Sequence, residues 1–260
     1  MLSLEGLKEF YPPFLQQQER FILREYLQYK ILEIIFESPF GNKLSFLGGT
    51  CLRIVYNNQR FSEDLDFDNF NLTQDDFDTF SKIVKTELNR LGLEVEIRNV
   101  FKGAFHCYIR FPGILFRQGL TKHQEEKILI RIDTEAHDFT YPPNLPLLNK
   151  FDVFARINST PADILLSQKF YAVLNRKRNK GRDFFDIVFL LGLGKGINYD
   201  YLDFKTGING PESLRQSIIN KCTQLNMQEM AKDVGPFLFH KKDEKKVLLF
   251  QDYIQHVGLN

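Results

Sequence analysis

Several residue types and patterns are scarce in this sequence, and each scarcity argues against a class of protein. The 260 residues include no Trp and only three Cys, at positions 51, 107 and 222. Such a small, odd-numbered and widely spaced set of thiols fits neither a disulfide framework nor a zinc site. No apolar run approaches the ~20 residues that a membrane-spanning helix needs, and the start, MLSLEGLKEFYPP, lacks the pattern of a signal peptide. We therefore expect a cytoplasmic protein with no membrane partner.

An excess of charge of either sign is also absent. The chain has 34 Lys and Arg against 33 Asp and Glu, a net charge of +1. No overall field attracts a nucleic acid or an anionic surface, so any such partner must be recognised by a local patch. Phe is abundant instead, with 26 residues, and 43% of the chain is hydrophobic. That supply is enough to bury the core of one large domain or two modest ones.

The first part of the chain reads as mixed α/β structure. Apolar residues at three- and four-residue steps predict a helix over 15–37. Thr73 and Asp76 form a capping-box pattern that opens a helix, and Gly92 is expected to end it. Alternating or short apolar runs predict strands at 44–47, 60–70, 94–100, 104–111 and 127–133.

The second part of the chain reads as helical. A Pro-containing connection at 141–143 separates it from the first part, and everything beyond is expected to be helix and loop. Thr160 and Pro161 predict a helix start, with Thr160 as the cap and Pro161 in the first turn. Another helix is expected over 182–191, and two or three more over 211–260. We expect two domains, 1–145 and 146–260, with the second closing the cleft of the first.

The most informative stretch is a Gly-Gly pair after a predicted strand, followed by an acid-x-acid strand. Gly48 and Gly49 allow a phosphate to approach the backbone closely, and a helix capped by Thr50 would point its positive end at the same place. Asp64 and Asp66 are spaced to face one side of a strand, with Cα atoms ~7 Å apart. Two carboxylates so close favour a divalent cation between them, Mg²⁺ or Mn²⁺. This combination is typical of a site that binds an NTP through a metal ion.

Two-metal transfer chemistry needs a third acid from a neighbouring strand. Asp133, which ends the predicted strand 127–133, is the best candidate, and Asp68, Glu135 and Asp138 are weaker ones. The plainer interpretation is that Gly-Gly is a turn and that the acids are solvated charge. The order and spacing of the two elements together favour the catalytic interpretation.

At this point the sequence resembles the AbiEii/AbiGii toxin nucleotidyltransferases, a family with the DNA polymerase β-like fold. The residues that carry the resemblance are Gly48–Arg53 with Arg60–Phe67, and, further on, Lys169–Ala172 with Arg182–Ile187. It covers roughly residues 44–192. It implies an α/β (α+β) nucleotidyltransferase core with a mixed sheet and a C-terminal helical domain. It also implies NMP transfer from an NTP, a tRNA 3′ end as acceptor for some members, and a cognate antitoxin as partner.

The second motif can be interpreted in two ways. On adjacent helices, Lys169 would contact the triphosphate, Asp183 would orient it or position the acceptor, and Asp186 would help to bind the nucleotide. Alternatively, the same residues would form a buried salt bridge that joins the two helices. The segment between these two helices is basic, and it could bind the RNA backbone or simply be a solvated loop. Its cations are Arg176, Lys177, Arg178, Lys180 and Arg182.

Smaller assignments and rival functions stay open. Ser62 could bond a phosphate or cap the turn before the strand. The acceptor could be a protein, such as the antitoxin, rather than RNA. The chain could instead be a catalytically silent binding module or, with less support from the second motif, an antibiotic-modifying nucleotidyltransferase.

Overall fold

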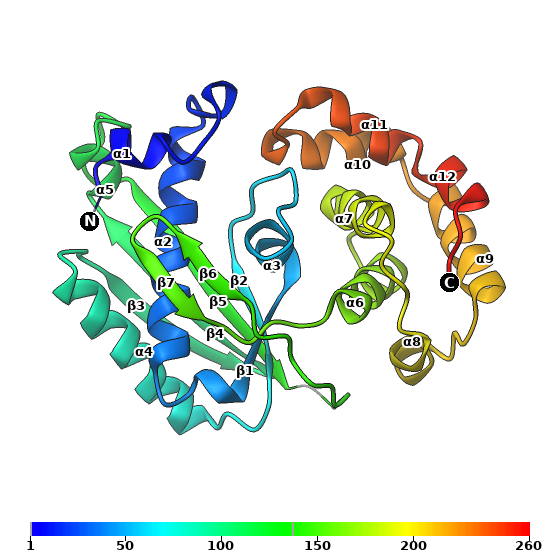
Figure 1. The fold of residues 1–260 in the computed structure, drawn as a ribbon, viewed down its shortest axis with the longest axis horizontal. Coiled ribbons are helices and arrows are strands. Elements are labelled where there is room, and N and C mark those ends of the chain that lie inside the picture. Colours follow the sequence, from blue (N-terminus) through cyan, green and yellow to red (C-terminus); the bar gives the residue numbers. More distant parts are fainter. Residues whose placement is uncertain (1, 137) are drawn as a thin grey trace. The chain divides into compact units, whose positions relative to one another are not determined.

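The computed structural model describes residues 2–136 and 138–260, and the chain divides into two compact units (Figure 1). Unit 1 contains the chain up to Tyr56 and Phe61–Ser159, and unit 2 contains Asn57–Arg60 and Thr160–Asn260. The chain therefore enters unit 2 for four residues between the Gly-Gly segment and the acid-x-acid strand. The 145/146 boundary expected from the sequence lies inside unit 1.

Unit 1 is built on a five-stranded mixed sheet with the order β1-β2-β5-β4-β3. Neighbouring strands are antiparallel except for β2 and β5, which run parallel. The strands are β1 (Leu44–Leu47), β2 (Leu65–Asn69), β3 (Glu96–Lys102), β4 (Ala104–Pro112) and β5 (Lys127–Ala136). The mixed sheet and the α/β class agree with the fold expected from the sequence.

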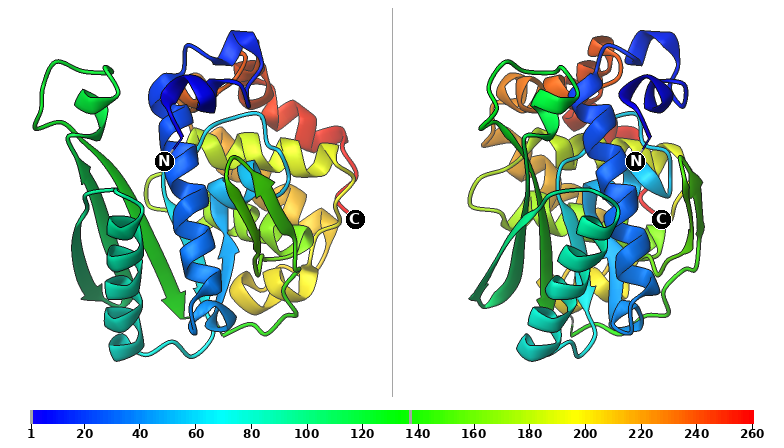
Figure 2. Two further views of the ribbon diagram at one scale, coloured as in Figure 1. Left: turned by 60° about the vertical axis from the view of Figure 1, so that its left-hand side comes forward. Right: turned by 90° about the vertical axis from the view of Figure 1, so that its left-hand side faces the viewer.

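One face of this sheet is buried and the other carries the polar residues. Alternation places Phe67, Ile132 and Ile109 in the core, all at most 2% exposed. The long helices α2 (Glu19–Glu37) and α4 (Gln74–Arg90) run side by side in unit 1 (Figure 2). Asn99 on β3 donates to Asp78 on α4 at 2.7 Å, so the odd-numbered β3 side chains face the helices. The even-numbered β3 and β4 residues are left on the opposite, open face.

The remaining elements of unit 1 are short. A two-stranded hairpin of β6 and β7 contacts α2. The expectation of helix throughout this region was wrong, because Leu148 and Ala155 alternate with exposed neighbours and are buried as strand residues. The bounds are α1 (Leu4–Lys8), η1 (Pro13–Leu15), η2 (Gly41–Lys43), α3 (Gly48–Ile54), α5 (Ile114–Arg117), β6 (Leu147–Lys150) and β7 (Val153–Arg156).

Unit 2 is helical apart from its loops. Helix α7 packs against α6, α10 and α11, and its residues Phe184, Phe185 and Ile187 are fully buried. The bounds are α6 (Ala162–Asn175), α7 (Gly181–Gly192), α8 (Tyr199–Thr206), α9 (Pro211–Thr223), α10 (Met227–Val234), η3 (Gly235–Phe237), η4 (Lys241–Glu244), α11 (Lys245–Leu248) and α12 (Phe250–His256). No helix in the described part of the chain is long and apolar enough to cross a membrane.

Local sequence signals were confirmed at some boundaries and wrong at others. The Thr73–Asp76 capping box is present, and Gly92 follows α4 with φ +77°. The predicted cap at Thr160 is absent, because Pro161 itself is the N-cap residue of α6. Thr50 is not a cap either, because α3 already begins at Gly48 and Leu47 precedes it.

Candidate active site

The Gly-Gly segment forms a tight turn from β1 into α3. Gly48 has φ +77°, a conformation that favours glycine. A Cβ atom at Gly48 would lie 2.4 Å from Oδ2 of Asp66, because Leu47 pairs with Asp66 across the antiparallel β1–β2 ladder. The glycine is therefore required for two reasons, its conformation and the close approach of the Asp66 carboxylate.

Side-chain contacts fix α3 against the segment that leads into β2. The buried Thr50 hydroxyl donates to the backbone carbonyl of Asp64. Arg53, also on α3, forms a buried ion pair with Glu25 of α2 at 2.8 Å. Ser62 is 9% exposed, and its carbonyl accepts a hydrogen bond from Gln28 at 3.1 Å. Thr50 thus holds the acid-bearing segment in place, whereas its predicted role in phosphate binding stays a prediction, as does that of Ser62.

The acids that the sequence singled out converge on the open face of the sheet. Asp66 on β2 is the register partner of Asp133 on the parallel neighbour β5. Asp64 precedes β2, which begins at Leu65 rather than near residue 60. The weaker candidate Asp68 is 5% exposed and accepts a hydrogen bond from the hydroxyl of Tyr141. Of the proposed third acids, Asp133 is therefore the one placed directly beside Asp66.

Arg131 on β5 forms ion pairs with both Asp64 and Asp133. Nη2 of Arg131 lies 3.2 Å from Oδ2 of Asp64. Its Nε lies 2.7 Å from Oδ2 of Asp133 but makes no well-directed hydrogen bond, so this contact is mainly ionic. Burial disfavours the charged guanidinium, but the negative charges of Asp64, Asp133 and Asp66 outweigh it and raise the pKa of Arg131.

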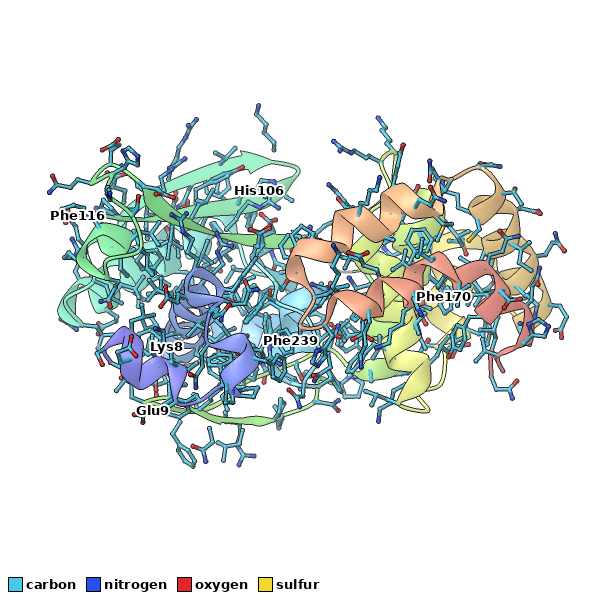
Figure 3. All side chains as sticks on the ribbon, turned by 90° about the horizontal axis from the view of Figure 1, so that it is seen from above. Lys8, Glu9, His106, Phe116, Phe170 and Phe239 are labelled. Atoms are coloured by element: carbon cyan, nitrogen blue, oxygen red, sulfur yellow. The ribbon has the colours of Figure 1, made fainter. Side chains whose placement is uncertain are left out.

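A histidine contacts the other side of Asp133. His106 on β4 is its register partner, and Nδ1 lies 2.6 Å from Oδ1 of the carboxylate. Figure 3 labels His106 within unit 1. The sequence analysis missed both His106 and Arg131. Arg131 could have been found from its i, i−2 relation to Asp133 on one strand, whereas His106 depends on the pairing of β4 with β5.

The donor set fits a hard divalent cation. In the described part of the chain, no group of three His, Cys, Asp or Glu side chains is arranged to hold a metal ion as it stands. The guanidinium of Arg131 supplies a positive charge to both Asp64 and Asp133. Mg²⁺ is commonly held by only one or two carboxylates together with substrate phosphates. Asp66 and Asp133, with Asp64 nearby, provide oxygen ligands of that kind.

Unit 2 contains a second cluster, which is buried. Nζ of Lys169 lies 2.9 Å from Oδ1 of Asp183 and 2.8 Å from Oδ2 of Asp186. Arg60 pairs with Asp186 at 2.7 Å, and Asn58 donates to the same carboxylate at 2.8 Å. Burial favours the neutral acid, but Arg60 and Lys169 outweigh it and lower the pKa of Asp186 to about 2. The geometry is that of the structural ion-pair alternative, and the nucleotide-binding roles stay predictions.

Four of the five residues of the basic run lie in the loop between α6 and α7, and Arg182 is the second residue of α7. Arg176, Lys177 and Arg178 are exposed, whereas Lys180 is half-buried. Arg176 also pairs with Asp183 at 3.2 Å, and the Arg182 guanidinium stacks over the ring of Phe237 at 5.1 Å. The exposed cations lie on the surface of unit 2, and their predicted contact with RNA stays a prediction.

Comparison with known proteins places the chain in a family. Residues 30–246 match the family described as nucleotidyl transferase AbiEii toxin, type IV toxin–antitoxin system. The chain belongs to the AbiEii nucleotidyltransferase toxin family. The AbiEii match spans both the Gly-Gly and acid-x-acid segments and the Lys169–Asp186 region, so it confirms the resemblance on which the sequence analysis relied.

Two solved structures share the fold of this chain. JHP933 from Helicobacter pylori is 18% identical, with a TM-score of 0.54 over 91% of each chain. A candidate nucleotidyltransferase from H. pylori is 18% identical, with a TM-score of 0.55 over 91% of this chain and 94% of that one. No curated protein matches the sequence.

Proposed function

We propose that this AbiEii toxin transfers an NMP group from an NTP to a hydroxyl of RNA, and that the acceptor is a tRNA 3′ end. One observation carries the proposal. The Gly48 turn lies against the Asp66 carboxylate, and Asp66 is the register neighbour of Asp133. A phosphate-accessible turn and a carboxylate pair on one open sheet face are the two parts that nucleotidyl transfer requires.

Each residue of this face has a proposed task. The backbone at Gly48 and Gly49 lies close enough to the acids for one triphosphate to meet both. Asp64, Asp66 and Asp133 would hold a divalent cation, Mg²⁺ or Mn²⁺, which supplies charge neutralisation for the triphosphate. Asp133, oriented by His106 at 2.6 Å, takes the proton of the acceptor hydroxyl.

The chemistry conserves atoms and charge. The acceptor oxygen forms a new bond to the α-phosphorus while the bond from that phosphorus to the pyrophosphate oxygen breaks. Pyrophosphate leaves, and the acceptor keeps the NMP. The expected biological setting is cytoplasmic, with a cognate antitoxin that opposes the transfer. In this proposal Lys169, Asp183 and Asp186 keep their predicted roles in nucleotide binding.

The test is transfer of label to RNA. Purified protein is incubated with each α-labelled NTP, Mg²⁺ and total bacterial tRNA, and the RNA is separated on a denaturing gel. Label is expected on tRNA with the wild-type protein and is expected to be lost with Asp66→Asn. Asp75→Asn is the matched control, because Asp75 is an exposed aspartate in the first turn of α4. Equal labelling by Asp66→Asn and Asp75→Asn would refute the assignment of the site.

The same gel separates the rival functions. Label on the protein or on an added antitoxin, with none on RNA, would mean that the acceptor is a protein side chain. Retained NTP binding with no transfer to either acceptor would favour a silent binding module. The gel also identifies the nucleotide, because each NTP is tested alone.

A further inference from the structure

The open face of the sheet continues past the acids over β4 and β3. The cross-strand registers define its rows. Asp133 on β5 pairs with His106, and the next row joins Arg131, Tyr108 and Arg98 across the three strands. A third row contains Arg110 and the 39% exposed Leu129. Residues in a row share one face, so these side chains form a continuous surface that begins at the proposed reaction centre.

This surface is accessible in unit 1. The alternate β4 residues Cys107, Ile109 and Phe111 are fully buried, whereas Tyr108 and Arg110 are half-buried and Arg98 on β3 is exposed. These three side chains therefore stand on the face opposite α4. A polar, partly exposed face of this kind does not contribute to the core and is free to bind a ligand.

Charge and aromatic character identify the ligand. The guanidinium of Arg110 lies 5.9 Å from the ring centroid of Tyr108. Glu96, the register partner of Arg110, forms an ion pair with Lys127 at 2.8 Å, and the charges of Lys127 and Arg110 together lower its pKa. This one acid is outnumbered by Arg98, Arg110 and Lys127, so the surface keeps a net positive charge. Cations that alternate with an aromatic ring bind single-stranded nucleic acid, since the cations bind phosphates and the ring stacks with a base.

We infer that Arg98, Tyr108 and Arg110 form the binding surface for the single-stranded 3′ segment of the RNA acceptor. The inference rests on the proposed function and adds where the acceptor lies. Tyr108 stacks with a base near the 3′ end, and Arg98 and Arg110 bind phosphates on the 5′ side of that base. The terminal hydroxyl then reaches Asp133, one row away along β5, at ~7 Å between rows.

Fluorescence anisotropy with a labelled single-stranded RNA of about 12 nucleotides tests this surface. The double variant Arg98→Gln with Arg110→Gln is expected to bind more weakly, with a log–log salt slope shallower by about 1.4 because two phosphate contacts are lost. Tyr108→Ala is expected to bind roughly tenfold more weakly with an unchanged salt slope, because it removes stacking only. Arg90→Gln, at an exposed arginine on α4 with a 70% exposed side chain, is the matched control and should bind like wild type.

Binding of a fluorescent ATP analogue is measured on every variant, and near-wild-type values are expected. RNA affinity that is unchanged in both the double variant and Tyr108→Ala would overturn the inference, and loss of affinity in Lys177→Gln with Arg178→Gln instead would place the RNA on unit 2. Wild-type protein that transfers NMP to a protein acceptor but binds no RNA would also overturn it, while leaving the transfer chemistry intact. Circular dichroism confirms that the variants are folded.

Discussion

Arg131 should compete with the divalent cation for the acids of the site. Its guanidinium lies 3.2 Å from Asp64 and 2.7 Å from Asp133, and its side chain is 37% exposed. Replacing it with Gln removes the competing charge and leaves the carboxylates in place. We therefore expect Arg131→Gln to bind metal more tightly than wild type when no nucleotide is present.

The size of the gain follows from the two ion pairs. Partly exposed pairs are typically worth ~0.2–1 kcal/mol each, because water screens them. A combined loss of about 1 kcal/mol corresponds to a roughly fivefold lower Kd for the metal. Without metal, the same variant is expected to unfold at a lower urea concentration, since the three acids then repel one another, and added metal should restore part of that stability.

Electron paramagnetic resonance of free Mn²⁺ measures the affinity without any reaction. Arg131→Lys should fall between wild type and Gln, because it keeps the charge but loses the forked guanidinium. The double variant Arg131→Gln with Asp66→Asn should lose the gain, which would locate the Mn²⁺ at these acids. An Mn²⁺ affinity in Arg131→Gln that equals or falls below that of wild type would refute the reasoning.

Three further predictions concern close packing and buried charge. Gly48→Ala should abolish NMP transfer and destabilise unit 1 by ~1–3 kcal/mol, since its Cβ would meet the Asp66 carboxylate and φ is positive; urea unfolding and the gel assay measure both. Gly181→Ala should destabilise unit 2 by at least ~2 kcal/mol in the same unfolding assay, because its Cβ would lie 1.8 Å from the Met230 carbonyl oxygen. Asp186 has a depressed pKa in the fold, so its stabilisation is present above the usual value of 3.8 and is lost as pH falls towards about 2. Asp186→Asn should lower the free energy of unfolding by ~3–5 kcal/mol at neutral pH, and the variant should lose less stability than wild type as the pH falls. An acid-dependent loss as large as that of wild type would contradict the ion-pair interpretation.

The local elements of the site could be predicted from the sequence because their signals are local. Period-2 alternation, Gly-Gly after a strand and the Thr73–Asp76 capping box depend on neighbouring residues. They predicted α4 and four of the five sheet strands to within three positions, whereas β2 begins five residues later than expected. The sequence-based prediction failed where the local pattern is compatible with either a helix or a strand. The β6–β7 hairpin was missed because two of its exposed residues, Leu147 and Phe154, are apolar and hide the alternation of buried and exposed positions.

What the sequence by itself determined is the type of chemistry: a Gly-Gly turn, the acid pair Asp64 and Asp66, and a family with that motif. Only the tertiary structure decided which side chains meet. His106 contacts Asp133 because β4 and β5 pair in one particular register, and Thr50 binds the Asp64 carbonyl instead of capping a helix. Register and packing depend on residues far apart in the chain, and their contacts are fixed only when the whole sheet closes over its core.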